Sequence, residues 1–280
     1  METLLKKTVL ANGGDSFIDQ VMYGLRKITG VVAGNLSIIV FLLIWEISSR
    51  MEWVPRTFIS PPSEVASTLW DLLITGVLFK HIRVSFVRSF SGFLLAAAIA
   101  VPLGFLLGGW FRLFERSLTP VLRLFTEINP FTLFPVFILV FGIGEVSKIA
   151  MLFWVCLWPI LLNTITGIKN VDSLLVKSAR SMGVTGHTLF CKVILPAASP
   201  NIFHGLRTSC GVAFFMLIAA EMIGASSGLG WLVFNAQNNY QISKLFATTV
   251  VISALGLTLN FLFGEVEERY LSWKEKPPEY

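Results

Sequence analysis

A few ionisable side chains interrupt long apolar stretches of this sequence, and they are the residues best suited to contact a polar solute. Arg123 and Glu127 lie in one such stretch, and Arg207 and Glu221 lie in another. A charged group in hydrocarbon costs about 2.5–3.5 kcal/mol on insertion scales, so groups of this kind face water or protein instead of lipid. We therefore expect the two helices that carry them to line a solute path.

Glu127 is followed closely by Asn129 and Pro130, which should interrupt the helix. Proline has no amide hydrogen and disfavours helix at the residue before it, so nearby carbonyl groups need another partner. At ~1.5 Å per residue from an inner end near residue 118, Asn129 is expected ~16 Å deep, close to the middle of the membrane. The pattern suits a gate or a solute contact, and it equally suits a proline kink packed against neighbouring helices.

The segment 224–230 reads Gly-Ala-Ser-Ser-Gly-Leu-Gly and comes directly after the stretch that holds Glu221. Glycine permits tight turns and a close approach of backbones. The segment therefore fits a structural turn, and it also fits a direct part in gating.

Residue patterns for catalysis or cofactor binding are not apparent. The sequence has no Gly-x-x-x-x-Gly-Lys-Ser/Thr loop to hold nucleotide phosphates and no His-Glu-x-x-His zinc motif. Its histidines and cysteines are scattered singly: His81, His187, His204, Cys156, Cys191 and Cys210. We therefore predict no catalytic residue, no metal site and no bound cofactor in this chain.

Composition predicts that lipid surrounds much of the chain. Of its 280 residues 54% are hydrophobic and 14% are charged, and the mean hydropathy is +0.73. Crossing ~30 Å of hydrocarbon takes ~20 mostly apolar residues in a helix, because lipid offers the backbone no hydrogen-bond partners and a helix satisfies its own. Six stretches meet this requirement: 36–52, 87–110, 118–141, 148–167, 201–223 and 244–265. We predict an all-α membrane protein with about six transmembrane helices, of which the second, fourth and sixth have almost no charge in their interiors.

Lysine and arginine are concentrated on one side of the predicted membrane domain. With the N-terminus inside, the cytoplasmic segments carry thirteen of the 22 basic residues and the outer segments carry five. Because positive charge is retained on the cytoplasmic side, both termini are expected in the cytoplasm. The net charge of +5 then reflects topology, and nucleic-acid binding is not expected. On the outer side, Arg83 and Arg88 either attract an anion electrostatically or bind lipid headgroups.

The predicted layout is a cytoplasmic N-terminal segment over 1–35 with an interfacial helix at 16–28, a membrane domain over 36–266, and a cytoplasmic tail over 267–280. A further helix, capped by Ser63 and ended before Gly76, should lie on the outer surface. Each of these two extra helices also suits packing against neighbouring helices.

The cytoplasmic loop over 168–200 is the most informative part of the chain. Leu174, Leu175, Ala179 and Met182 share one side of a short helix that Gly183 can end. A second short helix, over 186–194, should stop before Pro196. A helical hairpin with an exposed apolar side needs a partner.

The spacing of this loop resembles the EAA loop of ABC-importer permeases, which reads Glu-Ala-Ala, three residues, Gly, nine residues, Ile, any residue, Leu-Pro. Four positions match in register: Ala179, Gly183, Leu195 and Pro196. Three positions depart, because Lys177, Ser178 and Val193 stand where the family has Glu, Ala and Ile. From about residue 36 to 270 the chain is similar to the taurine, sulfonate and nitrate branch, for example in its segments 142–149, 163–167 and 219–224. That branch usually has Pro-Pro where this chain has Asn129-Pro130.

The resemblance implies a type I ABC importer permease fold with the loop's short helix, within 174–186, docked in a groove on a separate ATPase. The residues implied in coupling are Leu174, Leu175, Lys177, Ser178, Ala179, Arg180, Met182, Gly183, Leu195 and Pro196. Lys177 in place of Glu suggests an acidic or neutral group in the partner groove. Candidate solute-path or gate residues are Arg88, Glu127, Asn129, Pro130, Arg207 and Glu221.

The resemblance also implies partners and a location. It predicts a homodimer in a bacterial inner membrane, two cytoplasmic ABC ATPase subunits that hold ATP and Mg, and a solute-binding protein outside. Import of a small anionic solute would proceed by alternating access. An ATP-independent secondary transporter or channel is the main alternative, and a membrane-bound enzyme is a weaker one.

Overall fold

The structure is a computed structural model that describes residues 36–53, 55, 57–110 and 112–271. Within these residues every regular element is helical. The chain divides into two compact units, one up to Ser67 and one from Thr68 onward, which are described separately. The predicted interfacial helix at 16–28 and most of the two predicted terminal segments lie outside the described residues.

The first unit contains a helix over 36–50 and the beginning of α2 (Pro62–Ile74). Glu46 joins these two elements, since the Ser63 amide donates to its Oε2 at 3.0 Å and the Ser63 hydroxyl donates to its Oε1 at 2.8 Å. The prediction that Ser63 caps α2 is therefore wrong. The helix begins one residue earlier, at Pro62, where a missing amide hydrogen costs nothing.

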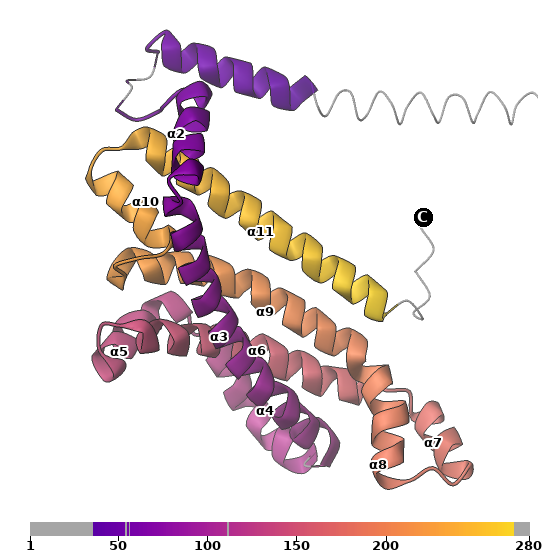
Figure 1. The fold of residues 1–280 in the computed structure, drawn as a ribbon. Helices are drawn as coiled ribbons and strands as arrows, with labels where there is room; N and C mark the ends of the chain where they lie inside the picture. Colours follow the sequence, from indigo (N-terminus) through magenta and orange to yellow (C-terminus); the bar gives the residue numbers. More distant parts are fainter. Residues whose placement is uncertain (1–35, 54, 56, 111, 272–280) are drawn as a thin grey trace, which may run out of the picture. The chain divides into compact units, whose positions relative to one another are not determined.

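The second unit is a bundle of helices (Figure 1). Its elements in chain order are α3 (Val77–Phe105), a π-helical turn (Leu106–Trp110), α4 (Arg112–Glu127), α5 (Pro130–Phe141), α6 (Glu145–Lys169), α7 (Ser173–Ser181), α8 (Gly186–Leu189), a second π-helical turn (Phe190–Ile194), α9 (Leu195–Gly224), α10 (Leu229–Asn238) and α11 (Ile242–Tyr270). Helix α6 packs against both α3 and α9, and α11 packs against α9 and α10. The centre of the unit is thus the group α3, α6 and α9.

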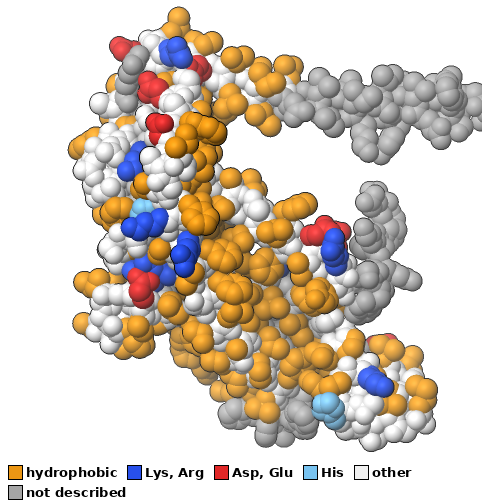
Figure 2. Space-filling view, viewed as in Figure 1, with side chains coloured by type: hydrophobic (Ala, Val, Ile, Leu, Met, Phe, Trp, Pro, Cys, Tyr) orange, Lys and Arg blue, Asp and Glu red, His pale blue; other side chains and the backbone are white. Residues whose placement is uncertain are grey.

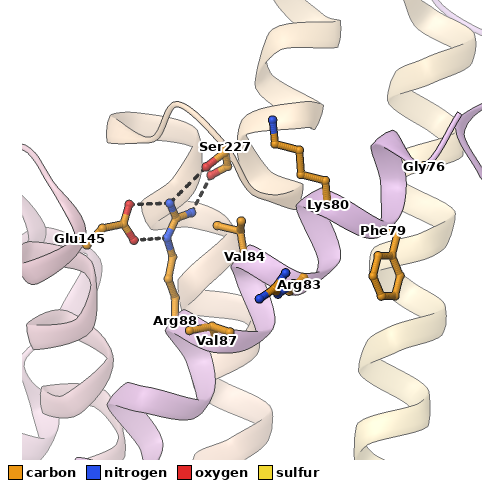
Figure 3. A pocket seen from close by; sticks show the side chains of 9 residues that line it. All are labelled: Gly76, Phe79, Lys80, Arg83, Val84, Val87, Arg88, Glu145 and Ser227. Carbon is orange, nitrogen blue, oxygen red and sulfur yellow. Dashed lines mark hydrogen bonds and ion pairs between the residues drawn. The ribbon is translucent and has the colours of Figure 1, made fainter.

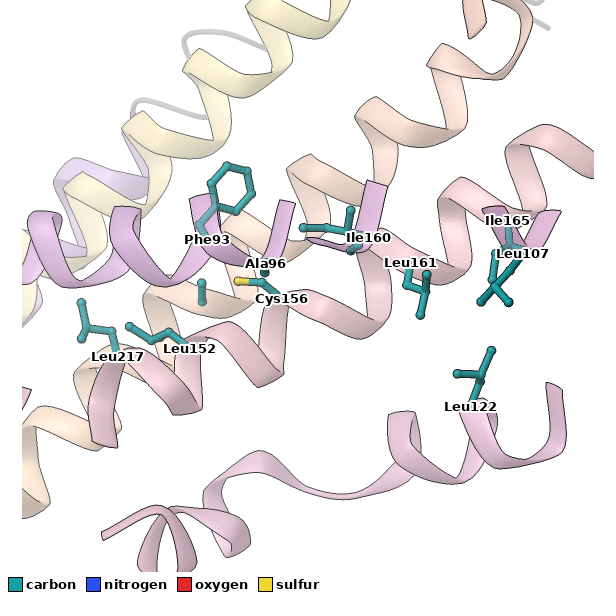
Figure 4. Packing of buried hydrophobic residues seen from close by; sticks show 12 residues of the cluster. Phe93, Ala96, Leu107, Leu122, Leu152, Cys156, Ile160, Leu161, Ile165 and Leu217 are labelled. Atoms are coloured by element: carbon teal, nitrogen blue, oxygen red, sulfur yellow. The ribbon is translucent and has the colours of Figure 1, made fainter. Parts of the chain in front are cut away.

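Small residues allow α3 to approach α6 closely. Gly92, Ala96, Ala100 and Gly104 recur every four residues of α3 and so share one face. A Cβ atom at Gly92 would lie 2.5 Å from the Cβ of Leu152 on α6, so only glycine fits there. Figure 4 shows the same contact surface, with α3 residues beside α6 residues in the buried cluster. Close approach of this kind is typical of helices packed within a membrane.

In the part of the chain that the structure describes, four helical segments are long and apolar enough to cross a membrane: Val77–Gly109, Glu145–Lys169, Gly186–Gly224 and Ile242–Tyr270. A fifth span is formed if the pair Ser117–Glu127 and Pro130–Phe141, bent by 91°, crosses as one. These correspond to the second to sixth predicted spans, whereas the described helix over 36–50, where the first span was predicted, is too short to meet the same criterion. Figure 2 shows hydrophobic side chains over much of the visible face of the bundle, as lipid contact requires.

Two predicted boundaries are wrong. Helix α3 begins at Val77 and not near residue 87, so its first three turns carry the basic residues that had been assigned to an outer loop. The second helix of the hairpin does not stop before Pro196, because the helical path continues from Gly186 to Gly224. The wider π-helical turn at Phe190–Ile194 precedes this proline, and Pro196 lies in the first turn of α9, where its missing amide hydrogen is tolerated.

Candidate functional site

Three polar residues of α3 point the same way. His81, Ser85 and Arg88 are spaced four and three residues apart, which places them on one face of the helix. All three are buried. They lie at the end of the bundle where α9 ends and α10 begins, which we call the glycine-loop end after the segment 224–230.

Arg88 connects three elements at this end (Figure 3). Its Nε and Nη2 donate to the two carboxylate oxygens of Glu145 at 2.5 and 2.6 Å, which is a bidentate pair. Its Nη1 donates to Glu221 at 2.7 Å and to the Ser227 carbonyl at 2.6 Å. A buried guanidinium with donors used in several directions fixes the starts of α3 and α6 against the end of α9.

Glu221 is the most enclosed charge of the site, with no exposed surface. Besides Arg88, its carboxylate accepts the Ser85 hydroxyl at 2.8 Å and the backbone amide of Gly230 at 2.9 Å. Every one of these donors comes from α3 or from the segment that follows α9. Glu221 therefore holds the glycine loop against α3.

Two glycines of this loop are required by the space available. A Cβ at Gly228 would lie 2.3 Å from the carboxylate of Glu221, and its φ of +124° is one that other residues rarely adopt. A Cβ at Gly230 would lie 2.2 Å from the carbonyl oxygen of Ile218. The Gly228 amide also donates to Nδ1 of His81 at 3.0 Å. The loop is thus a tightly fitted anchor, as the structural-turn interpretation requires.

The charges of the buried cluster at the glycine-loop end are balanced. Lys148 is 2% exposed and lies 3.6 Å from Glu145, so two cations, Arg88 and Lys148, are set against two anions, Glu145 and Glu221. Buried charges are tolerated when they are paired in this way. The cluster is closed on the Glu221 side and open at Glu145, whose side chain is 57% exposed.

A hollow of about 610 Å³ lies beside the open part of the cluster. Lys80, Arg83 and Arg88 line it together with Glu145, as Figure 3 shows. Lys80 and Arg83 are exposed, and neither has an ion-pair partner in the part of the chain that the structure describes. The hollow therefore has an excess of positive charge and attracts anions.

The predicted helix break at Asn129 and Pro130 is confirmed. Asn129 has extended backbone angles and its Oδ1 accepts the Phe131 amide at 2.9 Å, so it caps α5, with Pro130 as the first residue of that helix. Glu127 and Asn129 are both exposed. The two halves meet at 91°, so they do not both run along the membrane normal, and the mid-membrane depth expected for Asn129 stays a prediction.

Aromatic rings join the two halves of this broken segment to α6. Phe125 of α4 stacks on Trp158, and Phe137 of α5 contacts Trp154, which in turn packs edge-on against Trp158. The indole N–H groups of both tryptophans are buried and find no acceptor among the described residues. The bend is therefore supported by packing as well as by the proline.

Arg207 lies apart from the other candidates. Its Nη1 donates to Glu267 at 2.9 Å and its Nε donates to Asn260 at 3.2 Å, and both partners belong to α11. Arg88 and Glu221 are two predicted solute-path residues, far apart in the sequence, that the structure brings into direct contact.

At the other end of the bundle, α7 and α8 form the predicted hairpin. Asp172 caps α7 by accepting the Leu174 amide, and Gly183 ends it with a φ of +80°. Leu174, Leu175 and Met182 are 67%, 53% and 76% exposed. Ala179 is the exception to the predicted exposed side, because it is 4% exposed and faces the rest of the hairpin.

Ser85, Glu145 and Lys148 were not predicted as site residues. Recognising Ser85 required the correct start of α3, since His81, Ser85 and Arg88 share a face only if the helix extends back beyond residue 81. Glu145 and Lys148 lie on α6, and Glu145 joins the two cations of the cluster, Arg88 and Lys148. The spacing of His81, Ser85 and Arg88 was visible in the sequence. A hydropathy criterion, however, leaves basic residues out of a predicted span even when partners far along the chain neutralise them.

Residues 224–228 also fit the Gly-x-Ser-x-Gly pattern of serine hydrolases. That pattern needs a strand-to-helix turn, whereas this segment joins two helices, and the Nδ1 of His81 already accepts a backbone amide. Among the described residues, no group of three His, Cys, Asp or Glu side chains is arranged to hold a metal ion. The arrangement orients helices and attracts anions.

The fold and site define a polytopic membrane permease. The family model for the binding-protein-dependent transport system inner membrane component matches residues 100–271. The putative aliphatic sulfonates transport permease protein SsuC of Bacillus subtilis is 34% identical over 89% of this chain and 90% of its own. The taurine transport system permease protein TauC of Escherichia coli is 27% identical with the same coverage, and the nitrate import permease protein NrtB of Leptolyngbya laminosa is 30% identical over 77% and 80%.

Solved structures agree on the fold. The MetNI methionine ABC transporter in inward-facing conformations has a chain that matches 73% of this one and 98% of its own, with a TM-score of 0.57 and 20% identity. An amino acid ABC transporter crystallised with histidines matches 72% and 96%, with a TM-score of 0.58. This chain belongs to the binding-protein-dependent transport system inner membrane component family and has the type I ABC importer permease fold.

Proposed function

We propose that this chain is the permease subunit of an ATP-driven importer for a small anionic solute of the sulfonate or nitrate kind. Two copies form the pore in a bacterial inner membrane, with both termini and the hairpin in the cytoplasm. Two ABC ATPase subunits, which bind ATP and Mg, dock on the hairpins, and a solute-binding protein delivers solute outside. The observation that carries the proposal is the exposed apolar surface of α7 on a hairpin with EAA-loop spacing.

The hairpin is well placed to receive force from a partner. Leu174, Leu175 and Met182 expose large apolar side chains on a helix of nine residues, and such a surface is stable in water only when covered. The fully buried core of a protein interface is more apolar than its rim, and side chains of this type suit such a core. The residues proposed for coupling are those that resemble the family loop, including Ala179, whose burial fixes α7 against the hairpin.

Helix α9 offers a mechanical link between the two ends. It continues from the hairpin without a break and has 30 residues, or ~45 Å at 1.5 Å per residue. Its far end carries Glu221, which is tied to α3 and to the glycine loop. Closure of the ATPase pair would pull the hairpins together and shift α9, so that the pore opens alternately to the two sides. Glu127, Asn129, Pro130 and Arg207 are the further residues proposed along the path or its gate.

Charge at the glycine-loop end supports an anionic solute. Lys80, Arg83 and Arg88 outnumber Glu145 in the hollow there, and the named substrates of the relatives are sulfonates, taurine and nitrate. A positively charged entrance raises the local concentration of anions and their rate of arrival. The solute-binding protein would select among them.

Reconstitution tests the proposal. The chain would be placed in liposomes with its ATPase and binding protein, and uptake of ethanesulfonate, taurine and nitrate would be measured with and without ATP. We expect uptake only with ATP, and loss of ATPase co-purification in Leu175→Glu but not in Thr188→Glu, an exposed hairpin position outside the apolar surface. Uptake by this chain alone without ATP would support a secondary transporter or channel and overturn the proposal.

A further inference from the structure

A second hollow, of about 950 Å³, lies at the hairpin end of the bundle. Its walls are α7 on one side and α8 with the following π-helical turn on the other. The ends of α3 and α6 complete it, through Phe105 and Lys169. We call this space the basic hollow. It is distinct from the exposed apolar surface of α7, since Lys177 and Arg180 line it and Leu174, Leu175 and Met182 do not.

The basic hollow has an excess of positive charge. Lys169, Lys177, Arg180 and His187 line it, and none of its described lining residues is acidic. Lys169 is neutralised by Glu115, 2.6 Å away. Lys177 and Arg180 are exposed and have no ion-pair partner within the described ranges. Two free cations on consecutive turns of one helix suit a phosphate group.

The remaining lining is apolar. Phe105 and Ile194 belong to it, and the ring of Phe105 packs edge-on against Phe190, with centroids 4.9 Å apart. An inorganic anion gains nothing from such a wall, whereas an acyl chain does, at about 0.8 kcal/mol for each buried CH₂ group. The lining therefore fits a molecule that has an anionic head and an apolar tail.

The depth of the basic hollow is also that of lipid headgroups. Helix α6 has 25 residues, or ~37 Å at 1.5 Å per residue, against ~30 Å of hydrocarbon, so its two ends reach the headgroup layers. Lys169, which borders the hollow, is its last residue. Basic pockets between helices at this depth are suited to anionic phospholipids.

We propose that the basic hollow binds one anionic phospholipid, with the phosphate at Lys177 and Arg180 and an acyl chain along Phe105 and Ile194. The lipid fills the space behind α7 and so braces the hairpin from the side opposite its exposed apolar surface. Binding itself requires only the geometry of this chain. The bracing role rests on the proposed function, because it matters only if the hairpin transmits force.

Native mass spectrometry of the assembled transporter tests the binding. The complex would be purified from nanodiscs of phosphatidylcholine and phosphatidylglycerol, and the retained lipids counted. We expect selective retention of phosphatidylglycerol, and about thirtyfold weaker binding in the double variant Lys177→Gln, Arg180→Gln, since each basic residue near a lipid surface contributes about 1 kcal/mol. Lys192→Gln, which removes a hairpin cation outside the basic hollow, should bind within about twofold of the unchanged chain.

Further arms separate the possible outcomes. The charge-preserving variant Lys177→Arg, Arg180→Lys should retain the lipid, and size-exclusion profiles would show that all variants assemble. Inorganic phosphate would be titrated as a competitor. Competition by phosphate at micromolar concentration, or equal retention of phosphatidylcholine, would overturn the lipid assignment. ATP-dependent uptake without lipid selectivity would overturn this inference alone, and lipid selectivity without such uptake would overturn the proposed function alone.

Discussion

The two ends of the helical bundle differ in whether their main charged side chains are paired. At the glycine-loop end, Arg88 and Lys148 are matched by Glu145 and Glu221, and the loop amides donate to buried acceptors. At the hairpin end, Lys177 and Arg180 have no such partners among the residues that the structure describes, and the apolar side of α7 is exposed. The buried charges of the first end are paired with one another, although Lys80 and Arg83 in the adjoining hollow are not, whereas the second end combines unpaired cations with an exposed apolar surface among the described residues. Substitutions should therefore affect stability at the first end and association at the second.

The largest loss of stability is expected from Arg88→Leu. It would leave the fully buried Glu221 without a cation, and breaking a buried pair by removing one partner costs about 3–5 kcal/mol. The thermal unfolding midpoint of the purified protein would measure it, with the exposed Arg83→Leu as the control. Adding Glu221→Gln should recover part of the loss. A midpoint unchanged by Arg88→Leu would mean that the cluster does not hold this end together.

Gly228→Ala should come next. The added Cβ would lie 2.3 Å from the carboxylate of Glu221, at a φ of +124°, and strain of this kind costs about 1–3 kcal/mol. Gly211→Ala is a matched control within α9, since a Cβ there meets nothing within 4 Å. The same unfolding assay would compare the two. Equal midpoints would show that the loop adapts to the added methyl group and that the glycine-loop end is not rigid.

The structure of each end could be predicted from the sequence to the extent that it depends on contacts between residues close together in the chain. The hairpin depends on local rules: Asp172 caps α7, and Gly183 ends it, so both its existence and its exposed leucines were predictable. The break at Asn129 and Pro130 is local for the same reason. The position of Ala179 was not, because its burial depends on how α7 folds back on its neighbours.

The charge cluster depends on contacts far along the chain. Arg88 is 57 residues from Glu145 and 133 from Glu221, and these partners make its place inside a span acceptable. A criterion based on apolar stretches counts the basic residues of α3 as a boundary, so the helix was predicted to begin ten residues late. Arg88 and Glu221 were recognised as unusual, but their pairing required the packing of α3 against α9.

At the hairpin end, Leu174→Ser with Met182→Ser should separate association from stability. Both side chains are more than half exposed, so the free energy of unfolding of the isolated chain should change by no more than about 0.5 kcal/mol. Co-purification of the ATPase should fall sharply, because the covered apolar area is lost. Replacing Thr188 with Ala supplies an exposed hairpin control. Full retention of the ATPase would place its contact elsewhere.

Lys177→Glu should have the smallest effect on the fold and the most specific one on the partner. It restores the acidic residue that the similar loops carry, and since Lys177 is exposed, the isolated chain should unfold at the same midpoint. If the ATPase groove presents an acidic or neutral group here, the new carboxylate should weaken assembly and reduce stimulated ATP hydrolysis, more at low salt than at high salt. Lys192→Glu makes the same charge change elsewhere on the hairpin and should have little effect. Unchanged assembly and coupling in Lys177→Glu would count against a groove matched to lysine.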